Sequence, residues 1–461
     1  MPGGLMSLLA VGAQDQYIHV GPEMSYFKQV VRKCTNFSME SVRQSFLTKP
    51  VLDQSRASFS CRISRIGDLL QQIYLSFELP NIYSDDKVRF RWIKNVANYM
   101  IYSYSIRVDT QLIDQRWGEW LDVWNELTMN QEKKYAYDRM TGNEEAYANP
   151  RSYKPLAVIR NNRITYFTYP KATSVEYPSI RKRRFFVPLD FWFTKNPSLA
   201  LPLIALQYQN IEVTIEMRGI EELYQVYDER IGMYMSPNEF RSKPYHSGIN
   251  VGIERFLSFD GLNNAPRIDI NAYLDCNFIF LDEPERRVIA SANTDMLVER
   301  IYRTEKEGIY AQNTVDLVIA NPVKEVIWLM RRTDAFKYNE WANFTAKHPE
   351  NQYFPILSTA RMLWNGLERF EEKPAAYFQL LQPYQHHTSA PRDGIYAYSF
   401  AIYPEKVQPS GSFNASMIQK IQLYLTTEQY PDVSDYQVVV YTVYYNIFRI
   451  MSGQGGMVFQ S

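Results

Sequence analysis

The chain has 461 residues, and its fifty Lys and Arg side chains are balanced by fifty Asp and Glu. A protein that packages nucleic acid needs surplus positive charge to displace counterions, so this neutrality argues against direct nucleic-acid binding. Near-zero net charge favours self-association, and the 35 Tyr suit both strand pairing and subunit interfaces. A chain of this length can form two β-domains and bury enough core to need no disulfide or structural metal.

The N-terminal residues 1–25 have no long strand pattern and are interpreted as an arm. Their apolar residues are too irregular for a sandwich core, yet they would be costly to leave in water: Leu5, Met6, Leu8, Leu9 and Val11. Burying these five side chains would contribute on the order of 5 to 10 kcal/mol before ordering costs. We therefore expect the arm to dock on a partner.

The N-terminus has no basic region of the kind that opens a signal peptide, and no segment approaches the roughly 20 apolar residues that span a bilayer. We therefore expect neither secretion by that route nor membrane integration. Cys34, Cys61 and Cys276 are far apart and form no CxxC pair, which indicates reduced thiols. Three sequons make Asn36, Asn343 and Asn414 glycosylation candidates, but their use requires entry to the secretory pathway.

A strand, Pro-rich loop and half-buried strand occur twice, about two hundred residues apart. The first copy has residues 185–193 before the alternating strand 211–218, and the second has residues 395–403 before residues 421–426. A repeat of this size predicts an all-β chain with two similar domains. We place them at residues 26–218 and 219–461, with a linker at about 219–265, where charge is mixed and Gly and Pro recur.

One stretch shows helical periodicity. Trp117, Trp120, Leu121, Trp124 and Leu127 follow the spacing of an amphipathic helix, which we expect to pack over the end of the first sandwich. The run 438–445 is apolar on both faces, which is typical of a central strand covered on both sides.

The sequence contains no pattern typical of catalysis. It has no HxH or HExxH, no phosphate-binding Gly-rich loop and no GxSxG. The adjacent His386 and His387 would point to opposite faces of an extended segment, so a loop role is favoured over a shared metal. We expect no catalytic, cofactor-binding or metal-binding residues, and no enzyme.

Several blocks resemble a known family. They are residues 12–15, 27–32, 35–41, 187–193 (VPLDFWF), 200–208, 393–400, 408–411 and 445–450, followed by Gly453 and Gly456. In this order, over essentially the whole chain, they resemble the major capsid proteins of nucleocytoplasmic large DNA viruses. The moderate loop lengths are more similar to the chlorella-virus and marseillevirus forms than to the asfarvirus form.

The resemblance implies two tandem eight-stranded jelly-roll β-sandwiches with short helices in loops. It also implies a homotrimer with a pseudo-hexagonal outline, a capsomer that tiles an icosahedral shell. The implied partners are neighbouring capsomers and minor capsid and penton proteins, with an internal viral membrane nearby but not spanned. The implied location is the outer capsid of the virion, assembled in the host cytoplasm. In the family, the arm would lie at the inward-facing base of the capsomer.

Two other classes share paired jelly rolls. A bicupin enzyme would need clustered His and Glu ligands on inward-facing strands, and the sequence has no HxH. A minor capsid or carbohydrate-binding protein could have the same architecture, because a jelly roll alone does not fix function.

Overall fold

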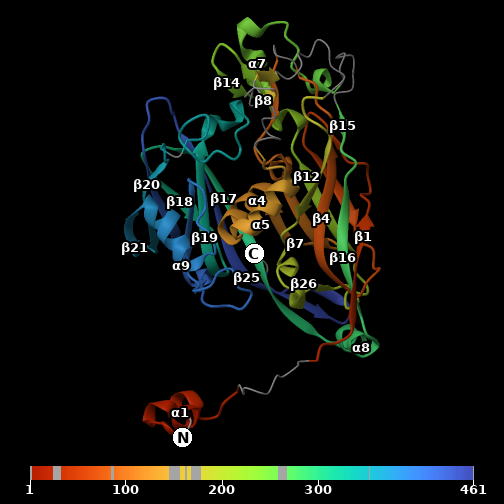
Figure 1. Ribbon diagram of the computed structural model, residues 1–461, viewed down its shortest axis with the longest axis vertical. Helices are drawn as coiled ribbons and strands as arrows, with labels where there is room; N and C mark the ends of the chain where they lie inside the picture. The colour runs from red at the N-terminus through yellow and green to blue at the C-terminus, as the bar shows by residue number, and fades with distance from the viewer. Residues whose placement is uncertain are drawn as a thin grey trace. The chain divides into compact units, whose positions relative to one another are not determined.

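The computed structural model describes residues 3–23, 33–84, 88–144, 178–257, 267–351 and 353–459, together with the backbone of the hairpin β8 (Leu156–Arg160) and β9 (Arg163–Phe167). The chain divides into two compact units, Met1–Phe37 and Ser38–Ser461. The first unit contains α1 (Gly3–Leu9), a 3-10 turn at Ala13–Asp15 and α2 (Gln16–His19). In the described part of the chain, all strands lie in the second unit, apart from the first residue of β1 (Figure 1).

The first β-sandwich pairs two sheets around one core. One sheet has the order β1 (Phe37–Gln44), β16 (Tyr273–Leu281), β4 (Leu69–Leu79) and β10 (Arg183–Pro188), and β11 (Leu201–Pro202) also pairs with β4. The other has the order β3 (Ala57–Arg62), β12 (Ile211–Met217), β6 (Ile101–Val108) and β7 (Gln111–Trp117). Apolar side chains from both sheets form one buried cluster.

The second sandwich repeats this arrangement. One sheet has the order β17 (Thr294–Ile309), β25 (Tyr436–Met451), β19 (Pro322–Arg332) and β22 (Ile395–Ser399), with β23 (Phe413–Asn414) on β19 and β26 (Gln454–Met457) on β25. The other has the order β18 (Gln312–Leu317), β24 (Ile421–Thr427), β20 (Leu357–Trp364) and β21 (Leu367–Pro374). A second buried cluster fills the space between them.

Both sandwiches have the same strand order. If the eight main strands of each are numbered along the chain, one sheet in each reads 1-8-3-6 and the other 2-7-4-5. This is the connectivity of a jelly roll, so the expected pair of eight-stranded jelly rolls is confirmed. The two copies of the sequence repeat are the sixth and seventh strands of each jelly roll. These strands are β10 and β12 in the first jelly roll, and β22 and β24 in the second. In β12 and β24 every second side chain is buried, as the alternation predicts.

The domain boundary expected at residue 219 does not coincide with the end of the first jelly roll in the structure. β16 pairs with β4, from Tyr273 opposite Ser76 to Ile279 opposite Leu69, and is the eighth strand of the first jelly roll. The described part of the expected linker joins the seventh strand to this eighth one, and buries Tyr224, Phe240 and Phe256 in the first core. The first jelly roll therefore extends to Leu281. Its last strand lies between the first and third, a long-range pairing that local pattern does not reveal.

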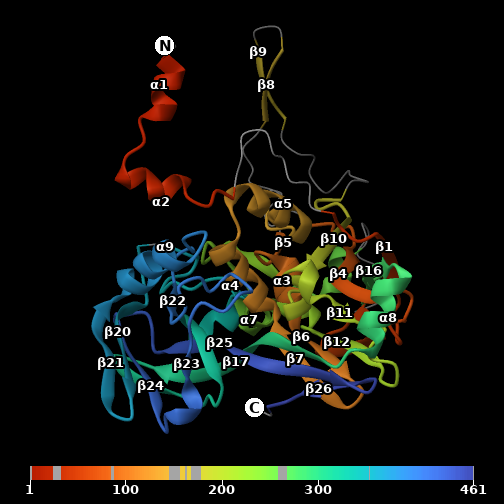
Figure 2. The same ribbon diagram turned by 90° about the horizontal axis from the view of Figure 1, so that it is seen from below.

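The short elements lie in the loops between the main strands, as expected (Figure 2). The helices are α3 (Val96–Met100), α4 (Gly118–Thr128), α5 (Gln131–Thr141), α7 (Pro237–Ser242), α8 (Glu283–Ser291) and α9 (Gln382–His386), the last continuing a π-helical turn at Tyr377–Leu381. The minor strands are β2 (Val51–Leu52), β5 (Phe90–Trp92), β13 (Tyr224–Asp228), β14 (Met233–Met235) and β15 (Ile268–Asp269).

Helix α4 forms where the Trp spacing predicts a helix, but it packs elsewhere. Leu121 belongs to the first core, whereas Trp120 and Trp124 join a third cluster with Val439 and Tyr441 of β25. The opposite face of β25 contributes to the core of the second sandwich. The run 438–445 is thus covered on both faces, as predicted, and α4 lies between the two sandwiches rather than over the end of the first. Periodicity identifies the apolar stripe of a helix but not the surface that buries it.

Candidate functional site: the sandwich junction and exposed surfaces

The junction between the two sandwiches contains buried ion pairs. Arg392, six residues after α9 ends, donates to Asp122 of α4, with 2.5 Å between Nη2 and Oδ2, and its Nη1 lies 3.3 Å from Glu126 Oε1. The Tyr99 hydroxyl and the Asn95 amide also donate to Asp122. Burial alone would raise the pKa of Asp122, but Arg392 and the hydrogen bond from Tyr99 hold it below its usual value.

A second contact joins α4 to the sheet that it covers. Arg331 of β19 donates to Glu119 across 2.5 Å, and the Tyr441 hydroxyl of β25 donates to the other Glu119 oxygen at 2.7 Å. Arg116 of β7 is paired with Asp114 and donates to the backbone carbonyl oxygen of Glu299 at 3.2 Å. These groups are buried. Each of these charges is paired, either with a group of the opposite sandwich or with a neighbour in its own sandwich.

The third contact is a cluster of six charged groups. Lys195 and Lys324 both bind Glu299 of β17, with 2.5 and 2.7 Å between nitrogen and oxygen. Burial would raise the pKa of Glu299, but the two ammonium groups lower it to about 2. Nearby, His387 lies 3.3 Å from a carboxylate oxygen of Glu325 and 3.3 Å from one of Glu405. The six charged groups of the cluster are therefore Lys195, Lys324, His387, Glu299, Glu325 and Glu405.

These contacts join the two jelly rolls at a fixed junction. Ion pairs buried in this way add little net stability over apolar packing, but removing one partner leaves an uncompensated charge. The junction is therefore intolerant of sliding or rotation between the sandwiches. A chain built in this way presents its two jelly rolls as one rigid piece.

The sequence gives a partial signal of this junction. Lys324 and Glu325 are adjacent charges inside the apolar run of β19, and a bulge between Val323 and Glu325 shifts its register against β25. Charges inside a buried strand indicate pairing with other buried charges. Their partners come from other strands and loops, and the sequence analysis did not find them. His387, expected in an ordinary loop role, is buried among carboxylates.

Exposed apolar side chains lie on the helical segment that ends with α9 and on the loop after β22. These side chains are between 42% and 85% exposed, and we call them the α9 patch: Leu380, Leu381, Tyr384, Ile402 and Tyr403. The helix and the following loop are in contact here, because His386 Nδ1 lies 3.0 Å from the Ile402 carbonyl oxygen. Clustered exposed side chains of this size are typical of a protein interaction surface.

The five apolar side chains of the arm are all exposed within their own unit. They are Leu5, Met6, Leu8, Leu9 and Val11, at 50% to 76% exposure, and all but Val11 lie on α1. They are thus unpartnered in the described part of the arm. Among the helices in the described ranges, none combines the length and the apolar character needed to cross a bilayer.

The three sequons differ in accessibility. Asn36 and Asn414 are exposed. Asn343 is buried, and its Nδ2 donates to Glu340 Oε2 at 2.8 Å and to the Lys347 carbonyl oxygen at 2.9 Å. The expectation that Asn343 could carry a glycan does not fit this geometry, because both amide hydrogens are engaged inside the folded chain.

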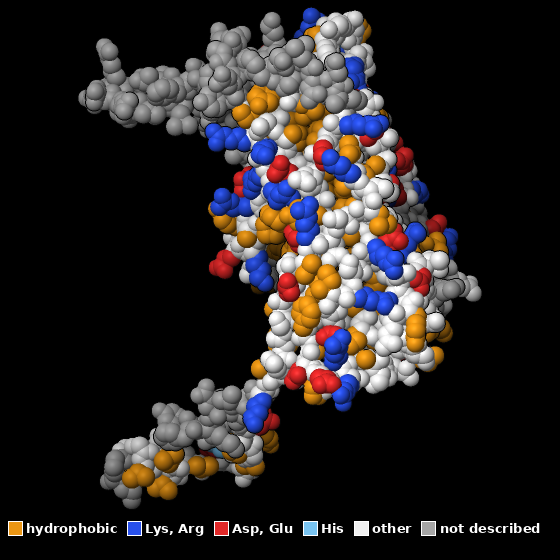
Figure 3. Space-filling view, turned by 90° about the vertical axis from the view of Figure 1, so that its right-hand side faces the viewer, with side chains coloured by type: hydrophobic (Ala, Val, Ile, Leu, Met, Phe, Trp, Pro, Cys, Tyr) orange, Lys and Arg blue, Asp and Glu red, His pale blue; other side chains and the backbone are white. Residues whose placement is uncertain are grey.

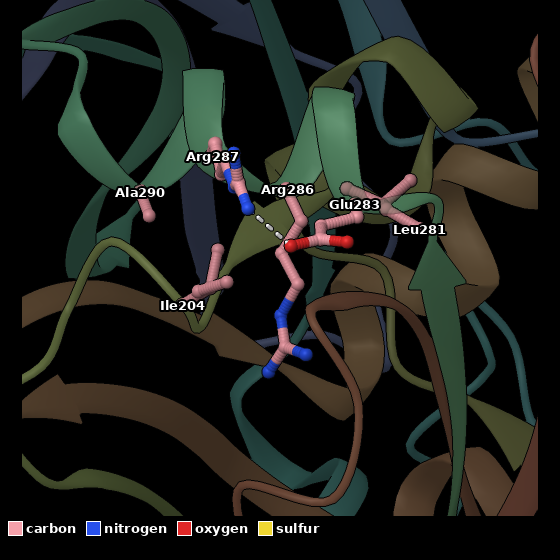
Figure 4. Close-up of a pocket in the computed structure, with 6 residues that line it drawn as sticks. All are labelled: Ile204, Leu281, Glu283, Arg286, Arg287 and Ala290. Carbon is pink, nitrogen blue, oxygen red and sulfur yellow. Dashed lines mark hydrogen bonds and ion pairs between the residues drawn. The ribbon is translucent and has the colours of Figure 1, made fainter.

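Other charged groups at the surface form ion pairs with near neighbours. On the face shown in Figure 3, Lys and Arg side chains are interspersed with Asp and Glu. A pocket beside α8 has Arg287 paired with Glu283 (Figure 4), and Arg286 lies 3.0 Å from Asp68. Within the part of the chain that the structure describes, no group of three or more His, Cys, Asp and Glu side chains is placed to hold a metal ion.

Two family models match the chain over most of its length. Residues 25–282 match "Major capsid protein N-terminus", and residues 285–456 match "Large eukaryotic DNA virus major capsid protein". The first match ends one residue after the last strand of the first jelly roll. Among curated relatives, the major capsid protein of Pyramimonas orientalis virus is 30% identical and that of Phaeocystis pouchetii virus 28%, each with 100% of both chains covered.

Solved structures share the fold. The Faustovirus major capsid protein superimposes with a TM-score of 0.70 at 13% identity, covering 97% of this chain and 96% of its own. VP54 of PBCV-1 gives a TM-score of 0.68 at 24% identity, covering 95% of this chain and 100% of its own. The relatives and the structural neighbours are structural capsid proteins, not enzymes.

Proposed function

The chain belongs to the family of major capsid proteins of large eukaryotic DNA viruses, and from this premise we propose that three copies form a capsomer with a pseudo-hexagonal outline that tiles an icosahedral shell. The observation that carries the proposal is the shared strand order of the two jelly rolls. Three chains with two similar sandwiches each supply six similar corners, so a threefold assembly has nearly sixfold packing edges.

Three physical features support this tile. The buried ion pairs at the junction hold the two jelly rolls in one arrangement, which a repeating lattice requires. The balanced charge lowers repulsion between copies. The α9 patch supplies apolar surface of the kind that a permanent interface buries.

The further partners follow from the same proposal. The arm docks at the inward-facing base of the capsomer on minor capsid proteins, through Leu5, Met6, Leu8, Leu9 and Val11. Neighbouring capsomers and penton proteins contact the edges, and an internal viral membrane lies nearby without being spanned. The charge balance argues against direct nucleic-acid contact. The place of the protein is the virion capsid, and its assembly takes place in the host cytoplasm.

The copy number of the chain in purified particles tests the proposal. A tile dominates the protein mass of the particle, and its double jelly roll fits the repeating density of the shell. A minor capsid or carbohydrate-binding protein of the same architecture would be scarce and confined to special positions. Quantitative mass spectrometry of purified particles, with the penton protein as internal reference, separates the two. A copy number at or below that of the penton protein would contradict the tile.

A further inference from the structure

His387 connects two segments that lie under the α9 patch. It follows α9 directly, and its ring lies between Glu325 of β19 and Glu405 of the loop after β22. Glu405 also accepts from the backbone nitrogen of Thr388 at 2.7 Å and from the Thr388 hydroxyl. The His387 ring therefore joins α9, the loop that carries Ile402 and Tyr403, and the sheet beneath them.

Glu325 depends on this ring. It is fully buried, and within the described residues its ion partner is His387 alone. Its neighbour Lys324 is directed to Glu299, which it shares with Lys195. If the ring is protonated, the cluster holds three cations and three anions and is neutral. If the ring is neutral, one buried negative charge remains without compensation.

Within the described residues, the other elements packed around His387 contribute no cation that pairs with Glu325 or Glu405. From α4, Trp124 faces the ring edge-on with centroids 6.4 Å apart, and the same indole lies 4.6 Å from Lys195 Nζ and 5.8 Å from Lys324 Nζ. From β25, the Tyr445 ring lies 5.9 Å from Lys324 Nζ. Glu126 of α4 is engaged by Lys134 and Arg392. The charge of His387 thus decides the balance of the cluster.

We propose that His387 is a proton-operated clamp that, when charged, holds α9 and residues 400–410 in place and that releases the α9 patch when it loses its proton. The device couples the acidity of the medium to the surface that the protein offers to its neighbours. It depends on the contacts within one chain. Its outcome is therefore independent of whether the chain forms the trimer proposed above.

The direction of the pH dependence follows from the contacts. Burial by itself would lower the pKa of His387, but the hydrogen bonds and charges of Glu325 and Glu405 outweigh it and raise the pKa from 6.5 to about 9. A group whose pKa is raised by folding stabilises the fold fully below its unfolded value. The stabilisation is therefore complete below pH 6.5 and is lost as the pH rises to about 9.

Hydrogen exchange of the full-length protein measures the release. Peptides from residues 382–388 and 400–410 are compared at pH 6.5 and pH 9.5, with exchange times scaled for the intrinsic rate of amide exchange. We expect these peptides to lose at least tenfold of their protection at the higher pH, while peptides from β12 keep theirs. Unchanged protection in both segments would overturn the proposal.

Two variants separate a proton switch from a merely structural contact. In Glu405→Gln the amide can still accept from Thr388, but one of the two carboxylates facing His387 is gone, so the midpoint of the transition moves to lower pH. His19→Gln is the control, because His19 is exposed and belongs to the separate unit Met1–Phe37. In the control, the midpoint of the pH transition should remain at its wild-type value. A Glu405→Gln midpoint equal to wild type would also overturn the clamp. The pKa of His348 is raised too, so peptides 344–351 are followed separately.

Discussion

Arg392 and Asp122 are separated by 270 residues in the sequence, and their side chains meet with 2.5 Å between Nη2 and Oδ2 at the junction of the two jelly rolls. Arg392 comes from the segment before β22, and Asp122 from α4. Because α4 also inserts Trp120 and Trp124 against β25, the junction combines apolar packing with paired charge. This combination fixes how the second jelly roll sits on the first.

Arg392→Ala should destabilise the protein by about 3 to 5 kcal/mol, because Asp122 and Glu126 lose their buried cation. Arg449→Ala is the control, since Arg449 pairs with Asp295 at the surface with both side chains half exposed. Exposed pairs of this kind contribute little. Thermal melting compares the two variants with wild type at pH 7. Equal melting temperatures for the two variants would contradict a structural role for the junction.

Asn343→Asp should lower stability by about 1 to 3 kcal/mol, because a carboxylate replaces the amide that donates to Glu340 and the Lys347 carbonyl oxygen. Asn414→Asp is the matched change at an exposed sequon. There the side-chain oxygen that accepts from the Ser416 nitrogen is kept, so melting should be unchanged.

Intact-mass analysis after expression in eukaryotic cells should find no glycan on Asn343. A glycan at Asn343 of the folded protein would contradict the buried geometry.

The three cysteines should differ in reactivity. Cys34 is exposed, whereas Cys61 and Cys276 are buried. Burial, with a smaller effect of Glu212, raises the pKa of Cys61 to about 11, and burial raises that of Cys276. A thiol reagent at pH 8 should label Cys34 quickly in the native protein and all three after unfolding.

Reductant should leave the melting temperature unchanged. A drop of several degrees would show that a disulfide had formed.

Deleting residues 2–22 should leave melting near normal, because the arm belongs to a unit separate from Ser38–Ser461. Incorporation into shells should fall, since Leu5, Met6, Leu8, Leu9 and Val11 are then missing from their docking surface. Co-expression with full-length protein and quantification of both forms in particles measures the defect. Equal incorporation would exclude a docking role, and failure to fold would make the arm part of the core.

Much of the fold could be predicted from local pattern. The alternation in β12 and β24, the helical spacing around Trp120 and the continuous apolar run of β25 each report burial along a single element. The repeat of sixth and seventh strands gave the two sandwiches. These signals are local, and a single sequence carries them directly.

The rest depended on contacts between distant segments. The eighth strand of the first jelly roll pairs with β4, two hundred residues earlier, so its assignment to the first sandwich was not visible. The same holds for α4, whose apolar stripe faces the second sandwich, and for His387, whose carboxylate neighbours come from β19 and a later loop. Only the adjacent charges Lys324 and Glu325 inside a buried strand signalled that a paired cluster was needed.

The mass of the purified protein in solution tests the capsomer most directly. We predict a particle of about 163 kDa, three times the 54.2 kDa chain, at micromolar concentration by light scattering, with a pseudo-hexagonal outline in negative-stain images. Tyr384→Glu should weaken this trimer by placing a charge in the α9 patch, whereas Tyr353→Glu, at an exposed Tyr outside the patch, should not. A stable wild-type monomer of 54.2 kDa under these conditions would contradict the account.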